Sequence, residues 1–408
     1  MPLSALNPAH PALFEADTMW PYFERLRAEA PVQKCEESQF GPYWNITKYE
    51  DIKYVDTNHE LFSSDSRMGG IRLGGQVSLD EEPDPTFHLP MFIMEDQPKH
   101  DEQRKVVAPM FAPRHLAAFE PLIRSRAQEI LDNLPRNETF NWVDLVSKDL
   151  TGRMLSTLFG VPQEDRDKLI YWSDCVENLS NPDAFESVEA GFQELWNCWQ
   201  YFDELWKERA ASNADGGDLI SMLVNGESTK DMPPNEYLGN ILLLIVGGND
   251  TTRNSITGGV LALNQNPAEY DRLRQDVSLI PNMVSEIIRW QSPVAHMCRT
   301  ALDDTEIGGQ KIARHDKLCM WYLSGNRDED AFEAPNEFRI DRADARKHLS
   351  FGFGIHRCLG NRLGEMQLRI LWEEIMQRFP SIEVVGDPVY LKSSFIHGIR
   401  ELPVRISA

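Results

Sequence analysis

Residues 351–360 read Phe-Gly-Phe-Gly-Ile-His-Arg-Cys-Leu-Gly and place a single cysteine, Cys358, in a glycine-rich loop. Glycine tolerates positive φ angles and allows close backbone approach, so Gly352, Gly354 and Gly360 predict a tight loop around a flat ligand. A helical pattern of apolar residues resumes directly after the loop. Cys358 is therefore expected near a helix N-terminus, where free N–H groups and the helix dipole favour a thiolate.

A second informative segment, Gly247-Gly248-Asn249-Asp250-Thr251-Thr252, lies inside a helical pattern that runs from 235 to about 263. Two glycines within a helix cost about 1 kcal/mol each, so the pair indicates a close approach or a local opening of the helix. Helical spacing places five residues on one face. These residues are Leu243, Val246, Gly247, Asp250 and Thr251.

The spacing Phe-x-x-Gly-x-x-x-Cys-x-Gly, filled by Phe351, Gly354, Cys358 and Gly360, resembles the haem-ligand signature of the cytochrome P450 monooxygenases. The Asp-Thr pair after Gly-Gly resembles the oxygen-activation motif of the same haem-thiolate family. This resemblance spans most of the chain. It implies the cytochrome P450 fold, mainly α with a small β region, in one haem-binding domain over residues 1–408.

The resemblance also implies the site. Haem b (iron protoporphyrin IX) would take Cys358 as its axial thiolate, and Asp250 and Thr251 would deliver protons to bound dioxygen. Haem propionates need cations or hydrogen-bond donors. The matching positions are His100, Arg104, Arg299 and His356. The expected pocket walls are Leu243, Val246, Gly247, Val294, Ala295 and Phe395, with 66–95 and 171–206 as a lid.

A Glu-x-x-Arg pair, Glu286 and Arg289, lies between the long helix and the cysteine loop. It stands where the family carries a structural ion pair. In the family, a Pro-x-Arg-Phe motif supplies a further arginine, but residues 335–338 read Pro-Asn-Glu-Phe here. Either Arg339 or Arg342 is a candidate to complete the network.

Composition restricts the class of protein. The chain has 408 residues, 41% of them hydrophobic, and no Pro/Gly/Ser linker, which favours one large domain. A formal net charge of −23 opposes binding to nucleic acid. The longest apolar run, 241–246, is far shorter than the ~20 residues of a membrane span. The N-terminus lacks a secretion signal, so a cytoplasmic location is expected.

The six cysteines are scattered without a close pair, which argues against a zinc motif or a disulfide framework. Five of them are expected to be structural thiols. These are Cys35, Cys175, Cys198, Cys298 and Cys319.

Apolar periodicity predicts helices near 18–30, 99–110, 115–133, 141–159, 164–211, 235–263, 266–290 and 359–379. The pattern over 164–211 is interrupted at 180–183, and loops are expected at 66–95 and 211–218. Short strands are expected near 43–47, 299–313, 382–391 and 402–407.

The resemblance implies a monooxygenase that receives electrons from a [2Fe–2S] ferredoxin and its NAD(P)H-dependent reductase. Segments 94–105 and 247–255 are similar to those of bacterial hydroxylases that act on the terminal carbon of alkanes and fatty acids. A small hydrophobic substrate with a linear alkyl chain is therefore expected. The alternatives are a compact terpene or aromatic substrate, a peroxide-driven enzyme, and a non-catalytic haem-based binder.

Overall fold

The computed structural model describes residues 2–3, 6–75, 77, 89–178, 185–212 and 217–407. Its α-helices are α1 (Pro11–Glu15), α2 (Trp20–Glu29), α3 (Tyr49–Thr57), α4 (Lys99–Val107), α5 (Pro113–Asp132), α6 (Asp149–Phe159), α7 (Arg166–Asn178), α8 (Val188–Ser212), α9 (Leu219–Asn225), α10 (Pro234–Gln265), α11 (Pro267–Gln275), α12 (Ile280–Gln291), α13 (Tyr322–Gly325) and α14 (Asn361–Arg378). Short 3-10 helices include Ala345–Lys347 and Gly354–His356, and a π-helix spans Val143–Lys148.

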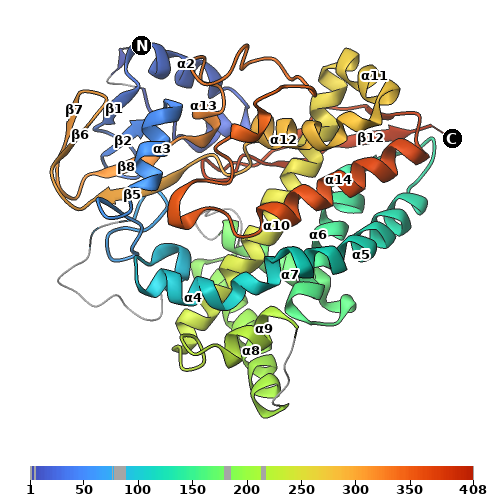
Figure 1. Ribbon diagram of the computed structural model, residues 1–408, viewed down its shortest axis with the longest axis horizontal. Helices are drawn as coiled ribbons and strands as arrows, with labels where there is room; N and C mark the ends of the chain where they lie inside the picture. The colour runs from blue at the N-terminus through green and yellow to red at the C-terminus, as the bar shows by residue number, and fades with distance from the viewer. Residues whose placement is uncertain are drawn as a thin grey trace.

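The strands are short, and in Figure 1 those labelled β1, β2, β5, β6, β7 and β8 lie at the left, whereas β12 lies at the right near the C-terminus. They are β1 (Val32–Cys35), β2 (Tyr43–Ile46), β3 (Phe62–Ser63), β4 (Thr139–Asn141), β5 (Met297–Ala301), β6 (Thr305–Ile307), β7 (Gln310–Ile312), β8 (Lys317–Met320), β9 (Ile382–Val384), β10 (Val389–Tyr390), β11 (Ile399–Glu401) and β12 (Pro403–Ile406). The largest sheet has the order β1-β2-β8-β5-β3, and a second sheet has the order β4-β12-β9.

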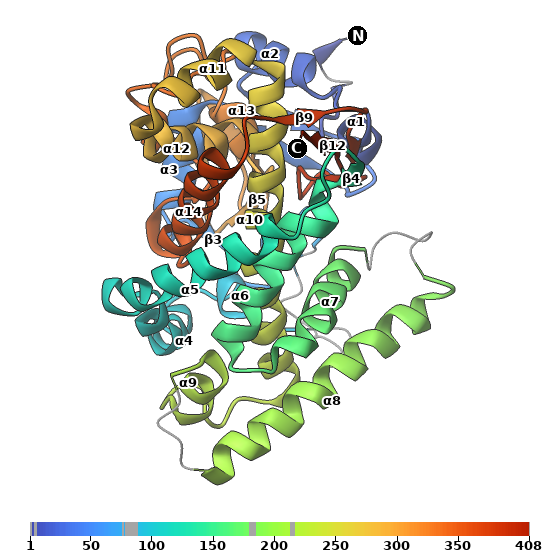
Figure 2. The same cartoon turned by 90° about the vertical axis from the view of Figure 1, so that its right-hand side faces the viewer.

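Helix α10 runs through the middle of the molecule, as Figure 1 and Figure 2 show. It packs against α6, α7, α12 and α14, which leaves most of its length enclosed. Most of its side chains are buried, including Ile241, Ile245 and Val260. Such a helix has apolar residues around its circumference because it has neighbours on several sides.

Helix α12 carries a buried charge network. Arg289 Nε lies 2.7 Å from Glu286 Oε2, and both side chains have no exposed surface. Arg342 completes the network, since its Nε lies 3.1 Å from each Glu286 carboxylate oxygen. Arg339 contributes only its backbone N–H, 2.9 Å from Glu286 Oε1. The guanidinium of Arg289 also donates to the Asn326 carbonyl at 2.6 Å.

Most predicted helices are confirmed, with ends shifted by a few residues. The prediction of one helix over 266–290 is wrong, because a 3-10 turn at Val277–Leu279 separates α11 from α12. The 141–159 helix begins as a π-helix after a short strand. Sequence patterns missed several short elements, among them α3, α9, β1 and β8. The predicted break at 180–183 and parts of the predicted loops lie outside the described residues.

Within the described part of the chain, no helix combines the length and apolar character needed to cross a membrane.

Candidate active site

Cys358 lies between the 3-10 helix Gly354–His356 and the first turn of α14. Its backbone N–H donates to the Phe351 carbonyl at 2.8 Å, which closes the loop on itself. Gly354 has φ 65°, and a Cβ there would lie 2.5 Å from the carbonyl oxygen of Asp56. Only glycine fits this position. Gly360 has φ −87° at the helix cap, so this glycine does not use a positive φ.

The sulfur of Cys358 faces the main cavity of the protein. Burial raises the pKa of its thiol, although the N–H of Gly360 and the charges of Arg104 and Arg357 oppose the shift. The N–H groups of Gly360 and Asn361 at the start of α14 lower the pKa of the thiol, as the sequence-based expectation requires, but burial has the larger effect. A metal ion bound to the sulfur would displace the thiol proton.

The two glycines of α10 serve different purposes. Apart from the backbone of α10 itself and the two neighbours in sequence, no atom of the described residues lies within 4 Å of a Cβ built on Gly247, which borders the cavity. A Cβ on Gly248 would lie 2.9 Å from the Leu155 side chain. Thr251 also borders the cavity, and its hydroxyl donates to the Gly247 carbonyl at 2.9 Å. Gly247 therefore leaves space beside Thr251, while Gly248 allows α6 to pack closely.

Asp250 is fully buried and is not among the described residues that line the cavity. Its carboxylate lies 2.6 Å from Arg253 Nη2 and accepts a hydrogen bond from Ser173 at 3.1 Å. Burial raises the pKa of Asp250 to about 7, although the charge of Arg253 opposes the shift. The predicted shared face is therefore only partly correct, because Asp250 points towards α7 while Thr251 faces the cavity.

Two buried histidines meet at the edge of the cavity. The ring centres of His100 on α4 and His356 are 4.3 Å apart, and His356 lines the cavity. His100 Nε2 and both ring nitrogens of His356 have no hydrogen-bond partner among the described residues. Burial lowers the pKa of both imidazoles. These nitrogens are available to a polar ligand group.

Arg299 on β5 also lines the cavity. Its guanidinium lies 2.7 Å from Asp56 Oδ1, and Tyr322 donates a hydroxyl hydrogen bond to Asp56 at 3.0 Å. Asp56 thus orients Arg299, a role that no sequence pattern indicated. Arg104 donates to the Arg357 carbonyl and does not line the cavity.

The cavity encloses about 540 Å³ between α10, α14, β5 and the segments on either side of residues 76–88. Its walls are mainly apolar. Of the predicted wall residues, it contacts Leu243, Val246, Gly247, Val294 and Phe395. Sequence reasoning missed Leu242 and Met297. The predicted lid also supplies lining residues, namely Ser66, Gly69, Gly70, Ile71, Arg72, Gly75, Leu89, Met91, Ile93, Met94 and Val176.

Ala295 is not among these lining residues. It is fully buried in an aromatic cluster with Phe14, Phe23 and Trp321. Its prediction as a pocket wall is not met, because neighbouring residues of an extended segment point to opposite faces. Val294 and Met297 border the cavity instead.

Arg72, in the segment predicted as a lid, is a further lining residue. Its guanidinium lies 4.1 Å from the centre of the Phe395 ring and 3.0 Å from Glu177. The arginine side chain is 43% exposed, whereas Glu177 is 9% exposed. Arg72 therefore places a cation between the apolar cavity and solvent.

The residues around the cavity fit a haem. The Cys358 thiol and the cavity-facing residues of α10 both border the cavity. The unpartnered nitrogens of His100 and His356, together with Arg299, offer donors of the kind that propionates require.

Residues 32–390 match the family model described as Cytochrome P450, and the chain belongs to that family of haem-iron monooxygenases. A linalool 8-monooxygenase of Pseudomonas putida is 35% identical over 398 residues, 97% of each chain. A methyl-branched lipid omega-hydroxylase of Mycobacterium tuberculosis is 33% identical, over 94% of this chain and 90% of the relative. The solved structure of cytochrome P450-153 from Novosphingobium aromaticivorans is 43% identical, with a TM-score of 0.92 over 98% of this chain and 99% of that one.

Proposed function

We propose that this monooxygenase hydroxylates the terminal carbon of a linear alkyl chain, in an alkane or a fatty acid. The main support for this proposal is that Thr251 and Gly247 border an apolar cavity that Cys358 also faces. A primary C–H bond is stronger than its secondary neighbours. Terminal attack therefore requires walls that hold the methyl end near the reacting centre and keep the methylenes away. Leu243, Val246 and Phe395 have the required apolar character.

We assign Cys358 as the axial ligand of haem b within one haem-binding domain. A thiolate-ligated haem, when bound, supplies the activation of dioxygen. His100, His356 and Arg299 would hold its propionates. Arg104, on the same helix as His100, would add positive charge beside the cysteine loop.

In this proposal Thr251 and Asp250 form successive parts of a proton path. The Thr251 hydroxyl already donates to the Gly247 carbonyl, so a small shift would redirect it into the cavity. Asp250 is one residue away and gains or loses its proton near neutral pH, because burial raises its pKa to about 7. An acid with a pKa near the working pH is suited to proton transfer.

Electrons would come from a [2Fe–2S] ferredoxin that is reduced by its NAD(P)H-dependent reductase. Five cationic side chains near the cysteine loop support this choice. Lys105, Arg114, Arg346, Lys347 and Arg362 are exposed. None of the five forms an ion pair with another residue that the structure describes. They could pair with an acidic partner despite the net charge of −23.

A fatty acid has a carboxylate that the cavity must accommodate. Arg72 lies at the cavity and is partly exposed, so exchange of its Glu177 partner for a substrate carboxylate would keep its charge paired. The name of the mycobacterial relative, a lipid omega-hydroxylase, is consistent with terminal attack. The name of the Pseudomonas relative favours a compact terpene as the second candidate.

The test is product analysis with the haem-loaded protein, a ferredoxin pair, octane, dodecanoic acid and linalool. We expect 1-octanol and 12-hydroxydodecanoic acid as the main products. Arg72→Leu should weaken dodecanoic acid binding about tenfold and leave octane binding unchanged, since only the acid has a charge to pair. Mainly mid-chain alcohols, or turnover of linalool alone, would reject terminal hydroxylation of linear chains.

A further inference from the structure

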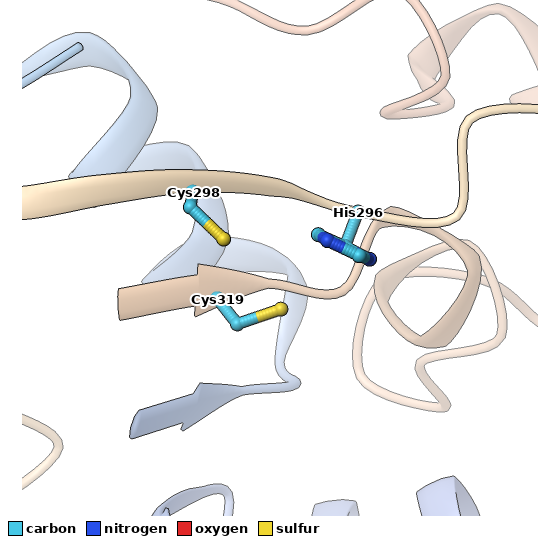
Figure 3. Close-up of side chains that lie close together, drawn as sticks. All are labelled: His296, Cys298 and Cys319. Atoms are coloured by element: carbon cyan, nitrogen blue, oxygen red, sulfur yellow. The ribbon is translucent and has the colours of Figure 1, made fainter. Parts of the chain in front are cut away.

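A histidine and two cysteines meet behind the wall of the main cavity. Cys298 on β5 stands directly opposite Cys319 on β8 in the antiparallel register, and His296 precedes β5. One ligand atom from each of the three residues lies within 4.8 Å of the other two. Figure 3 shows the two sulfur atoms and the imidazole gathered in one space between the strands.

The imidazole of His296 is set to accept rather than donate at this space. Its Nδ1 lies 2.9 Å from the Ser394 carbonyl oxygen, and a carbonyl only accepts, so Nδ1 carries the ring proton. In the neutral ring, Nε2 then has a lone pair. It has no nitrogen or oxygen hydrogen-bond partner among the described residues, and His296 is only 1% exposed. The neighbouring group that interacts with the imidazole is the Cys298 thiol. A backbone carbonyl that fixes the imidazole in this way is a usual feature of metal-binding histidines.

The surroundings select the kind of ion. Both cysteines are fully buried, and the cluster packs against Phe14, Phe23 and Trp321. No carboxylate belongs to the group of ligand atoms found among the described residues. Two thiolates and one imidazole suit a soft cation, whereas Ca²⁺ and Mg²⁺ require oxygen ligands.

We propose that His296, Cys298 and Cys319 bind a thiophilic metal ion, Cu⁺ or Zn²⁺, at a site separate from the haem iron. Binding forms two metal–sulfur bonds and one metal–nitrogen bond and releases both thiol protons to solvent. Neighbouring ligand atoms around such an ion are about 3.7 Å apart, so the three groups need to close by about 1 Å at most. Three donors complete a trigonal Cu⁺ site, while Zn²⁺ would take a fourth ligand.

The ion would join three segments that are distant in sequence. It would connect β5 to β8 and, through the Ser394 carbonyl, to the loop that carries Phe395. The ring centres of His296 and Phe395 are 5.5 Å apart, and Phe395 lines the cavity. The site would therefore stabilise one wall of the cavity. This inference does not depend on the identity of the substrate.

The full-length haem-loaded protein is purified with a reductant, and separate samples are incubated with Cu⁺ or with Zn²⁺ and then dialysed. The experiment measures the number of copper or zinc ions that each chain retains. Cys298→Ser and Cys319→Ser remove one sulfur each. Cys198→Ser is the matched control, because Cys198 is equally buried but lies on α8. The spectrum of the reduced CO complex verifies that each variant is folded.

We expect about one equivalent of one metal in the wild type and in Cys198→Ser, and at least a fivefold loss in the other two variants. Retention of copper assigns Cu⁺ and retention of zinc assigns Zn²⁺. X-ray absorption at the edge of the retained metal should show sulfur at ~2.3 Å and nitrogen at ~2.0 Å, a readout on wild-type protein alone. Absence of both metals, equal binding by Cys298→Ser, an oxygen-dominated absorption spectrum, or a Cys298–Cys319 disulfide in the purified protein would overturn the proposal.

Discussion

Asp250 and Arg253 form an ion pair of 2.6 Å within α10, and both side chains are buried. Arg253 is shared, because its Nη1 also lies 2.7 Å from Asp174 on α7. Asp250 therefore has a charged partner on its own helix and a link to the next helix. The pair connects the residue beside Thr251 to the outer surface of α7, where Asp174 is 37% exposed.

Protonation of Asp250 should be visible at neutral pH. An ordinary aspartic acid has a pKa of about 3.9, whereas burial raises the pKa of Asp250 to about 7. The folded protein therefore keeps this proton between roughly pH 4 and pH 7, where the unfolded chain has lost it. This group's contribution to stability falls as pH rises through that window. Infrared spectra should show a protonated carboxyl band that disappears above pH 7 and is absent in Asp250→Asn. The exposed control Asp303→Asn should retain it.

Replacement of Thr251 by alanine should separate binding from chemistry. Thr251→Ala removes the hydroxyl that lies at the cavity but no buried packing group, so haem and substrate binding should persist. Product formed per NAD(P)H should fall by about a factor of ten to a hundred, with peroxide formed instead. Substrate-binding spectra, NAD(P)H consumption and peroxide yield measure the two effects. Unchanged coupling would show that Thr251 has no part in the proton path.

The axial ligand can be tested by one cysteine series. Cys358→Ala should abolish the red-shifted Soret band of the reduced CO complex, because no other described cysteine lines the cavity. Cys35, Cys175, Cys198, Cys298 and Cys319 are buried elsewhere. Serine at each of these five positions should leave the band in place, and loss of the band in any folded member would reopen the assignment.

Arg342 should contribute strongly to stability. Arg342→Ala removes one of two buried cations around Glu286, and loss of a buried ion-pair partner costs about 3 kcal/mol. Arg339→Ala is the control, since its side chain is 39% exposed and should change the free energy of unfolding by less than about 0.5 kcal/mol. Denaturant unfolding of the haem-loaded protein compares the two. Equal effects would mean that the backbone of residues 333–339 maintains the network without Arg342.

Reversal of charge at two of the five exposed cations near the cysteine loop should slow reduction of the protein by the ferredoxin. The double variant Lys105→Glu and Arg362→Glu should lower the rate of electron transfer from the ferredoxin, because it removes charges that attract an acidic partner. The rate should also depend less on salt concentration, because less attraction is left for salt to screen. Lys311→Glu with Arg314→Glu, on and beside the β6–β7 hairpin, is a charge-matched control and should have little effect. A rate that is indifferent to both salt and the first pair would exclude this docking face.

The sequence by itself determined the family, the helix that crosses the molecule and the loop that carries Cys358. These features are local, since helical periodicity, a glycine pair and a cysteine between glycines can all be read within a short window. For the same reason Glu286 and Arg289, three residues apart on one helix, were recognised as a pair.

Only the tertiary structure decided which distant groups meet. The third member of the Glu286 network is Arg342, because the chain from 335 to 342 folds back over α12. Asp56 reaches Arg299 across 243 positions of sequence, and strand register brings Cys298 and Cys319 together. Which side an extended residue faces also depends on packing, so Ala295 enters the core while Val294 borders the cavity. Such contacts depend on the path of loops and the pairing of strands, which no local pattern encodes.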